Sequence, residues 1–344
     1  MNSRITKKKL ILNIVLLVTI TIISLNFVLK GEDKREIISI LGSTKKIYLY
    51  LGIILSLIFI LGEAINIKSM LKIIDYDISL IKGIKYAFIG FFFSGITPSS
   101  TGGQPMQIYE MKKDGIQVSH SSLVLLLALV SYQIVSFLYG FVGLIWFKDT
   151  MVLSNKTVLS LIFAGLSLNI VGIIFILTCI FNSKISIRVY KFIEKVMVLI
   201  PFINSEKKER VLKNFEKQIE EYNRCASYIK ENKSSLFKVF LITIIQMGSL
   251  FSISYVVYLA LGQHSKSILD IVLLQGLIYT GSSFIPIPGA VGVSETNFLS
   301  IFRGIYRKDL ISGAMLLSRG ISFYLLIIIS VFSIILIKIR EIQV

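Results

Sequence analysis

The 344-residue chain is 54% hydrophobic with a mean hydropathy of +0.77, which excludes an ordinary soluble domain and indicates an integral membrane protein. The formal net charge of +17 does not predict nucleic-acid binding, because the Lys and Arg residues lie in segments that alternate with apolar runs. The positive-inside bias and attraction to anionic lipid explain that pattern. The two Cys and two His residues have no metal-ligand spacing, and no nucleotide-binding loop or nucleophile elbow is present, so we expect neither a metal nor a cofactor.

Six apolar segments are long enough for the roughly 20 residues that a membrane-spanning helix needs. They are residues 10–29, 47–67, 118–147, 157–181, 236–261 and 310–337. The first follows a basic N-terminus but is long and has no small-residue cleavage site after it, so we interpret it as a retained span rather than a signal peptide.

Residues 182–235 differ from the rest of the chain in being highly charged. The pattern predicts an amphipathic helix at 189–199, suited to a membrane surface, and a charged helix at 206–233 with one apolar stripe. We expect a cytoplasmic helical insert that packs on the rest of the protein rather than a binding site for a partner.

Two further apolar segments are interrupted before they could cross a bilayer. Residues 86–96 meet the break 97–105 (TPSSTGGQP) and resume as a short helix at 106–113. Residues 268–284 meet the break 285–292 (IPIPGAVG), and the chain resumes over 290–304. Irregular backbone at membrane depth is tolerated only where protein covers it or a polar cavity adjoins it. We therefore predict two re-entrant hairpins.

The two hairpins recur at an almost fixed spacing, since Pro98 and Pro286 are 188 residues apart and Gly115 and Gly304 are 189 apart. The order span, hairpin, long span occurs in residues 47–147 and again in 236–337. With both hairpins re-entrant, 25 Lys and Arg residues fall on the side of the two termini and 11 on the other side.

This bias predicts a plasma-membrane protein with cytoplasmic N- and C-termini, in which the two blocks run in opposite directions. The predicted fold is all-α: a single polytopic domain, 1–344, of six transmembrane helices and two re-entrant broken-helix hairpins in an inverted repeat. Secondary transporters share this architecture.

Each break places a helix N-terminus next to glycines, at Gly102 and Gly103 and at Gly289 to Gly292. Such an amide end attracts anions, phosphate above all, and glycine lets the ligand approach the backbone. Polar side chains near the breaks can add hydrogen bonds: Ser99, Ser100, Thr101, Gln104, Ser282 and Ser283. A lipid phosphodiester suits such a pocket. The alternative is that the glycines only allow close helix packing.

Arg319 lies inside the last apolar segment, where a charge costs about 2.5–3.5 kcal/mol and should face a partner or a cavity. Glu295, three residues after Gly292, is the expected partner. The pair is either structural or holds a head group, with Arg319 on the phosphate and Glu295 on an amine. Glu110 is the corresponding acid of the first hairpin. Glu63 and Asp270 are weaker candidates, because a position at a membrane interface would also explain them.

Residues 97–115, the run Pro288-Gly-Ala-Val-Gly-Val-Ser-Glu295 and Arg319 together resemble the flippase-like membrane domain of lysylphosphatidylglycerol synthases. The resemblance covers nearly the whole chain. It implies movement of aminoacylated phosphatidylglycerol between leaflets, whereas a separate soluble C-terminal domain of full-length members makes that lipid from aminoacyl-tRNA. Here we expect no room for that domain after the last span. The family often has Arg soon after the first glycine-rich loop, where this chain has residues 107–112 (QIYEMK), so the first site is expected to be weaker or differently selective.

The sequence therefore predicts a flippase that binds a membrane phospholipid. One alternative is a phosphatidylglycerol lysyltransferase, which would use lysyl-tRNA and would form lysyl-lipid when membranes are incubated with it. The other is a non-transporting scaffold that binds a partner through residues 182–235. A lipid-modifying enzyme as partner and a homo-oligomer are further expectations.

Overall fold

The computed structural model describes residues 44–148, 155–182 and 205–343, with a few isolated positions outside these ranges. The described residues form helices and turns and contain no strand. The expected span at 10–29 and the expected amphipathic helix at 189–199 lie outside the described residues.

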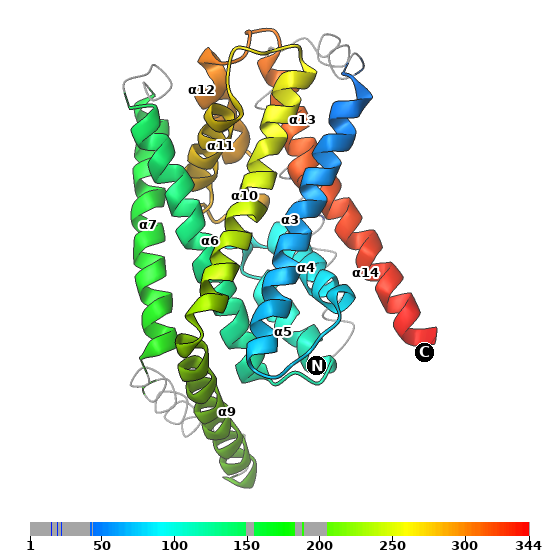
Figure 1. The fold of residues 1–344 in the computed structure, drawn as a ribbon, viewed down its shortest axis with the longest axis vertical. Helices are drawn as coiled ribbons and strands as arrows, with labels where there is room; N and C mark the ends of the chain where they lie inside the picture. Colours follow the sequence, from blue (N-terminus) through cyan, green and yellow to red (C-terminus); the bar gives the residue numbers. More distant parts are fainter. Residues whose placement is uncertain are drawn as a thin grey trace.

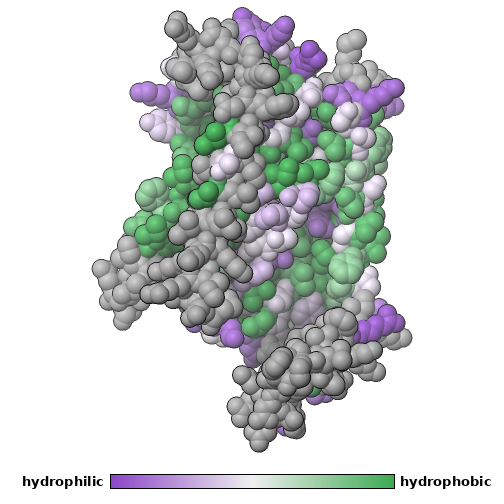
Figure 2. Space-filling model, turned by 180° about the vertical axis from the view of Figure 1, so that it is seen from behind, coloured by the Kyte–Doolittle hydropathy of each residue, from purple (hydrophilic) through white to green (hydrophobic). Residues whose placement is uncertain are grey.

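Five long apolar segments confirm five of the six predicted spans. They are α3 (Lys46–Ile73), α6 (Val118–Trp146), α7 (Lys156–Phe181), α10 (Lys233–Ala260) and the segment Ile311–Ile337. The helices α3 and α10 pack side by side through the centre of the bundle (Figure 1). In the space-filling view, an apolar belt separates polar residues at the two ends of the molecule (Figure 2). The chain is a multi-pass membrane protein.

The last span is not the uninterrupted helix that its hydropathy predicts. It consists of α13 (Ile311–Arg319), a π-helical turn (Gly320–Leu325) and α14 (Leu326–Gln343). The π-helix is rare and occurs mostly as a single turn within an α-helix, frequently at functional sites. This one begins directly after Arg319.

Both predicted hairpins are present, and they enter the bundle from opposite ends (Figure 1). The first hairpin consists of α4 (Leu80–Gly95), a short turn η1 (Pro98–Ser100) and α5 (Gly103–Lys113). The second hairpin consists of α11 (Ile268–Ser282), a short turn η3 (Pro288–Ala290) and α12 (Val293–Ile301), and it is followed by η4 (Phe302–Gly304). The two turns η1 and η3 pack against each other. We call residues 96–102 the first break and residues 283–292 the second break. Whether the two halves form an internal inverted repeat stays a prediction.

The first hairpin begins earlier than the sequence pattern indicated. The Ser79 Oγ atom accepts a hydrogen bond from the Lys82 backbone N–H at 3.3 Å and caps α4, so the helix starts at Leu80 rather than near residue 86. Lys82 and Lys85, which precede the apolar run at 86–96, therefore lie in α4 rather than in a loop. Lys85 is buried and pairs with Asp114 at the end of α5, at 2.9 Å.

The ion pair between Lys85 and Asp114 joins the two arms of the first hairpin, and Tyr86 donates a second hydrogen bond to the same carboxylate. Burial by itself would raise the pKa of the Asp114 carboxyl, but the Tyr86 hydrogen bond and the Lys85 charge outweigh it and hold the pKa below its usual value. The pair therefore stabilises the fold above the carboxyl's ordinary pKa, and this contribution is lost as the pH falls through the lowered pKa.

Asp114→Asn is expected to lower the free energy of unfolding by about 3 kcal/mol at pH 7, the scale of losing one partner of a buried pair. Thermal unfolding in detergent measures the effect, and the difference from wild type should shrink below about pH 4. The control is Asp77→Asn, since Asp77 is 81% exposed and lies 4.0 Å from Lys68. Equal effects of the two substitutions would contradict the expectation.

The charged helix expected at 206–233 is present as α9 (Ser205–Glu231), which packs against α6 and α7. Its apolar stripe includes Tyr222, Ala226 and Ile229, and these residues join the hydrophobic cluster at that end of the bundle. The stripe thus attaches α9 to the membrane-spanning helices.

Candidate functional site

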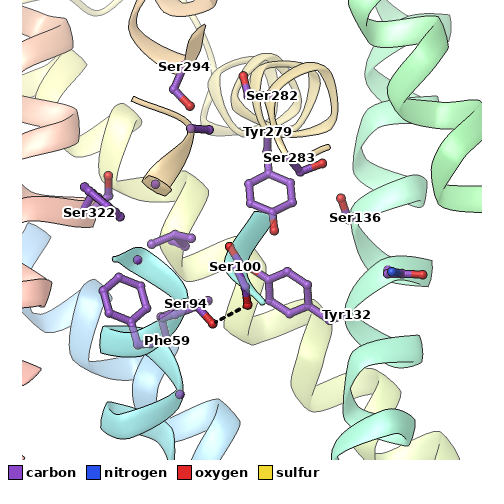
Figure 3. Close-up of a pocket in the computed structure, with 18 of the residues that line it drawn as sticks. Phe59, Ser94, Ser100, Tyr132, Ser136, Tyr279, Ser282, Ser283, Ser294 and Ser322 are labelled. Atoms are coloured by element: carbon purple, nitrogen blue, oxygen red, sulfur yellow. Dashed lines mark hydrogen bonds between the residues drawn. The ribbon is translucent and has the colours of Figure 1, made fainter. Parts of the chain in front are cut away.

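A cavity of about 630 Å³ lies where the two breaks meet inside the bundle. Its walls come from both hairpins and from α3, α6, α10 and the π-turn region after α13. Figure 3 shows serine and tyrosine hydroxyls from both sides of this space, among them Ser100, Tyr132, Tyr279 and Ser283. A polar chamber at the centre of an apolar bundle is the kind of space that the two breaks predicted.

Eight of the predicted site residues line the cavity: Ser99, Ser100, Thr101, Gln104, Ser282, Ser283, Gly289 and Arg319. The other five do not line it, namely Gly102, Gly103, Glu110, Gly292 and Glu295. The predicted site residues therefore fall into two groups, one that lines the cavity and one that lies outside its lining.

Gly103 serves close packing rather than ligand contact. A Cβ atom at this position would lie 2.1 Å from Ser94 Oγ and 2.7 Å from the Gly90 carbonyl oxygen. The start of α5 thus sits directly against α4. The neighbouring Gly102 N–H is bonded to Thr97 Oγ1 at 2.9 Å. The packing alternative therefore accounts for both Gly102 and Gly103.

Glu295 and Arg319 form the expected ion pair, with 2.9 Å between Arg319 Nε and Glu295 Oε1. The other carboxylate oxygen of Glu295 accepts the Gly292 N–H at 2.6 Å and caps α12. Arg319 Nη2 donates to the Gly289 carbonyl at 2.8 Å. The Glu295 side chain has 0% exposure, whereas that of Arg319 has 15%. The pair thus stabilises the conformation of the second break. The Glu295 carboxylate already occupies the N-terminus of α12, where the sequence predicted that an anionic ligand would bind.

Arg319 keeps donors for a ligand, because Nη1 has no hydrogen-bond partner among the described residues. The guanidinium carbon lies 4.6 Å from the ring centroid of Phe323, in the π-turn. The π-turn therefore places an aromatic ring against the cation while the free edge of Arg319 lines the cavity. A phosphate oxygen fits such a position.

Glu63 is a second charged group on the cavity wall, and sequence reasoning ranked it low as an interfacial residue. It lies in the middle of α3 and accepts a hydrogen bond from Gln246 Nε2 at 3.2 Å. No Lys, Arg or His of the described residues lies within ion-pairing distance of it. The rings of Tyr132 and Tyr279, 6.0 Å apart between centroids, line the same cavity. A carboxylate with amide partners beside aromatic rings suits a cationic group.

Several buried polar atoms of the cavity wall lack a partner within the described ranges. They are Gln133 Oε1, Ser136 Oγ and Ser318 Oγ. Buried polar atoms are otherwise almost always hydrogen-bonded, so these three favour a polar ligand or solvent in the cavity.

Both breaks also contain non-glycine residues in the left-handed conformation. Ser99 and Ser100 have φ values of 51° and 55°, and Ala290 has 50°. Each costs on the order of 1–3 kcal/mol and persists where the surroundings impose it, often at binding sites. The strained residues lie at the two hairpin tips that meet beside the cavity.

The remaining acidic candidates have structural partners. Glu110 is buried and pairs with Lys113 at 2.9 Å on the same helix. Asp270 caps α11 through Ser267 and accepts the Trp146 indole N–H at 3.0 Å. Neither lines the cavity.

Residues 11–330 match the family model described as the lysylphosphatidylglycerol synthase TM region. The chain is also similar to a UPF0104 membrane protein of Archaeoglobus fulgidus, with 22% identity over 306 residues, covering 85% of this chain and 90% of the relative. A UPF0104 membrane protein of Pyrococcus horikoshii is 23% identical over 292 residues, covering 81% of this chain and 83% of the relative. The family match spans most of the chain and includes both breaks and Arg319. The protein therefore belongs to the lysylphosphatidylglycerol synthase transmembrane-region family.

Proposed function

We propose that this protein moves a phospholipid between the two leaflets of the cytoplasmic membrane by exposing the central cavity to each side in turn. The observation that carries the proposal is the meeting of two hairpin tips, inserted from opposite ends, at a cavity whose wall carries charged and hydroxyl groups within an apolar bundle. Transporters with broken helices bind their substrates at such a place. The volume of about 630 Å³ lies within the usual range for ligand sites of about 300–1,000 Å³.

The chemistry of the cavity supports a lipid head group as the ligand. Arg319 offers free guanidinium donors to a phosphate, and hydroxyls of the two breaks line the same cavity. Glu63 offers a carboxylate to an amine. A phosphodiester that also carries a primary ammonium group uses both charges, because its N–H groups can donate hydrogen bonds to Glu63. This supports an aminoacylated phosphatidylglycerol such as the lysyl form over phosphatidylcholine, whose quaternary ammonium has no N–H donor.

The orientation belongs to the same proposal. With both termini on the cytoplasmic side, the first hairpin enters from the cytoplasm and α9 lies at the cytoplasmic end, because α9 and the ends of α4 and α5 share one end of the bundle (Figure 1). The excess of Lys and Arg on that side supports this orientation.

The test uses the purified full chain in liposomes that contain trace phospholipids with a fluorophore on one acyl chain. A membrane-impermeant reductant bleaches the labelled lipids of the outer leaflet and leaves those of the inner leaflet fluorescent. Movement of labelled lipids from the inner to the outer leaflet therefore appears as a further loss of fluorescence. We expect faster loss for phosphatidylglycerol and lysylphosphatidylglycerol than for phosphatidylcholine. Rates equal to those of protein-free liposomes for all three lipids would refute the proposal.

A further inference from the structure

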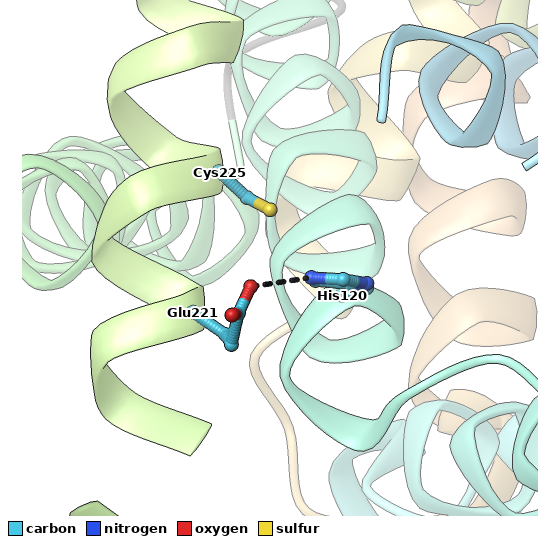
Figure 4. A group of neighbouring side chains, drawn as sticks. All are labelled: His120, Glu221 and Cys225. Carbon is cyan, nitrogen blue, oxygen red and sulfur yellow. Dashed lines mark ion pairs between the residues drawn. The ribbon is translucent and has the colours of Figure 1, made fainter. Parts of the chain in front are cut away.

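A group of three metal-ligating side chains lies outside the central cavity, where α9 packs against the start of α6. His120 is the third residue of α6, and Glu221 and Cys225 lie one turn apart on α9. Their ligand atoms all lie within 4.8 Å of one another. Figure 4 shows the imidazole, the carboxylate and the thiol directed toward a common point between the two helices.

The His120 ring has the arrangement that a metal-binding histidine usually has. Its Nδ1 atom is 3.1 Å from Tyr76 Oη, and the two rings pack edge to face. Its Nε2 atom is buried and has no hydrogen-bond partner in the described part of the chain, since Glu221 Oε2 lies 3.7 Å away. The residue is only 6% exposed. With the proton on Nδ1, the Tyr76 contact fixes the ring, and the Nε2 lone pair faces Glu221 and Cys225.

The ligand types select the metal. One imidazole nitrogen, one carboxylate oxygen and one thiolate sulfur suit Zn²⁺ and the similar Co²⁺, whereas Ca²⁺ and Mg²⁺ prefer oxygen alone. In a tetrahedral zinc site, neighbouring ligand atoms are about 3.3–3.7 Å apart, given zinc–ligand distances of about 2.0–2.3 Å. A shift of about 1 Å in the side chains from the present spread would meet that requirement.

One feature of the cluster opposes a cation. Arg224 Nη2 is 2.7 Å from Glu221 Oε2 and competes for that oxygen. The Arg224 side chain is 75% exposed, so it can leave toward solvent without a burial penalty. The other carboxylate oxygen, Oε1, has no hydrogen-bond or ion-pair partner among the described residues, and the Glu221 side chain is 23% exposed, so it connects the cluster to solvent.

We propose that His120, Glu221 and Cys225 form a three-ligand site for Zn²⁺ that fastens α9 to the membrane-spanning bundle. The site connects α9, a mainly charged helix that packs on the bundle through a short apolar stripe, to the first turn of α6. That turn follows the first hairpin directly in the chain. The fourth coordination position stays open to solvent or to a ligand of the metal. The function of the site is independent of the proposed lipid transport.

The test uses the purified full-length protein after removal of metals with a chelator, with Co²⁺ as a spectroscopic probe and Zn²⁺ as competitor. A thiolate–Co²⁺ charge-transfer band in the near ultraviolet is expected in the wild type, at one equivalent per chain, and Zn²⁺ should abolish it. Cys225→Ser should lose the band, and His120→Ala should bind Co²⁺ at least tenfold more weakly. The chain supplies matched controls in its other cysteine and histidine, so Cys179→Ser and His264→Ala should behave as wild type.

A further variant separates a metal site from a packing cluster. Arg224→Ala removes the competing cation and is expected to bind Co²⁺ about two- to fivefold more tightly, the factor that loss of an exposed ion pair allows. Zn²⁺ should raise the Tm of wild type and of Arg224→Ala but not that of Cys225→Ser. No thiolate band in the wild type, or a band that Cys179→Ser removes and Cys225→Ser keeps, would overturn the proposal, whatever the stability of His120→Ala.

Discussion

Replacing Glu295 with alanine is expected to lower the free energy of unfolding by about 3–5 kcal/mol, the cost of breaking a buried ion pair on one side. Glu295 is fully buried and uses both oxygens, one for Arg319 and one for the Gly292 N–H. Its removal leaves Arg319 with a single partner, the Gly289 carbonyl, in a largely apolar setting. It also uncaps α12. A thermal unfolding scan of the detergent-solubilised protein measures the loss.

The control for this prediction is an ion pair of the same length at the surface. Asp309 and Arg307 are 2.8 Å apart, with 39% and 69% of their side chains exposed. Asp309→Ala should cost less than about 1 kcal/mol, because exposed pairs contribute little. A double variant, Glu295→Gln with Arg319→Gln, should be more stable than the sum of the single effects indicates. If Glu295→Ala and Asp309→Ala had the same small effect, the assignment of Glu295 as the support of the second break would be wrong.

This result would change how the pair is interpreted. The sequence left open whether Glu295 holds an amine or only supports Arg319. The structure places Glu295 behind the cavity wall and leaves only Arg319 exposed to the cavity. Loss of transport in a Glu295 variant would therefore report a misshapen break rather than a missing ligand contact, so Glu295 cannot test substrate recognition by itself.

The features that sequence could predict are those with a local signal. The two breaks stand out because prolines and paired glycines interrupt apolar runs, and Arg319 stands out because a charge inside an apolar span needs a reason. The partner of Arg319 was predictable from its position just after a break. These residues predicted the hairpins, the ion pair and the part of the cavity wall that the hairpin tips and Arg319 form.

The features that sequence missed depend on packing between distant segments. Glu63 and Gln246 are 183 residues apart and meet only because α3 and α10 pack along each other. His120 and Cys225, which looked unrelated in the chain, meet because the stripe of α9 packs on α6. The π-turn after Arg319 has no signal in hydropathy, since the run 320–337 contains no charged residue and is mostly apolar on both sides of the turn.

Replacing Glu63 with glutamine is expected to remove the preference for amine-bearing lipids while leaving the fold intact. The amide has nearly the same shape and keeps a hydrogen bond with Gln246, but it no longer attracts an ammonium group in a low-dielectric cavity. A charge-assisted hydrogen bond contributes about 1.5–3 kcal/mol, so transport of lysylphosphatidylglycerol should fall about tenfold or more relative to phosphatidylglycerol in the liposome assay. The Tm should stay within about 2 °C of wild type, since the substitution creates no cavity.

Glu110→Gln is the matched control for this substitution, because Glu110 is a buried acid that does not line the cavity and pairs with Lys113 instead. It is expected to lower stability without changing the ratio of the two transport rates. Comparison of Glu63→Gln with Glu110→Gln thus separates the effect of removing a charge from the cavity wall from the effect of removing a buried charge elsewhere in the fold. If Glu63→Gln left the rate ratio at the wild-type value while both lipids still moved, the cavity would recognise the phosphate through Arg319 alone, and the role of Glu63 as the amine-binding group would be refuted.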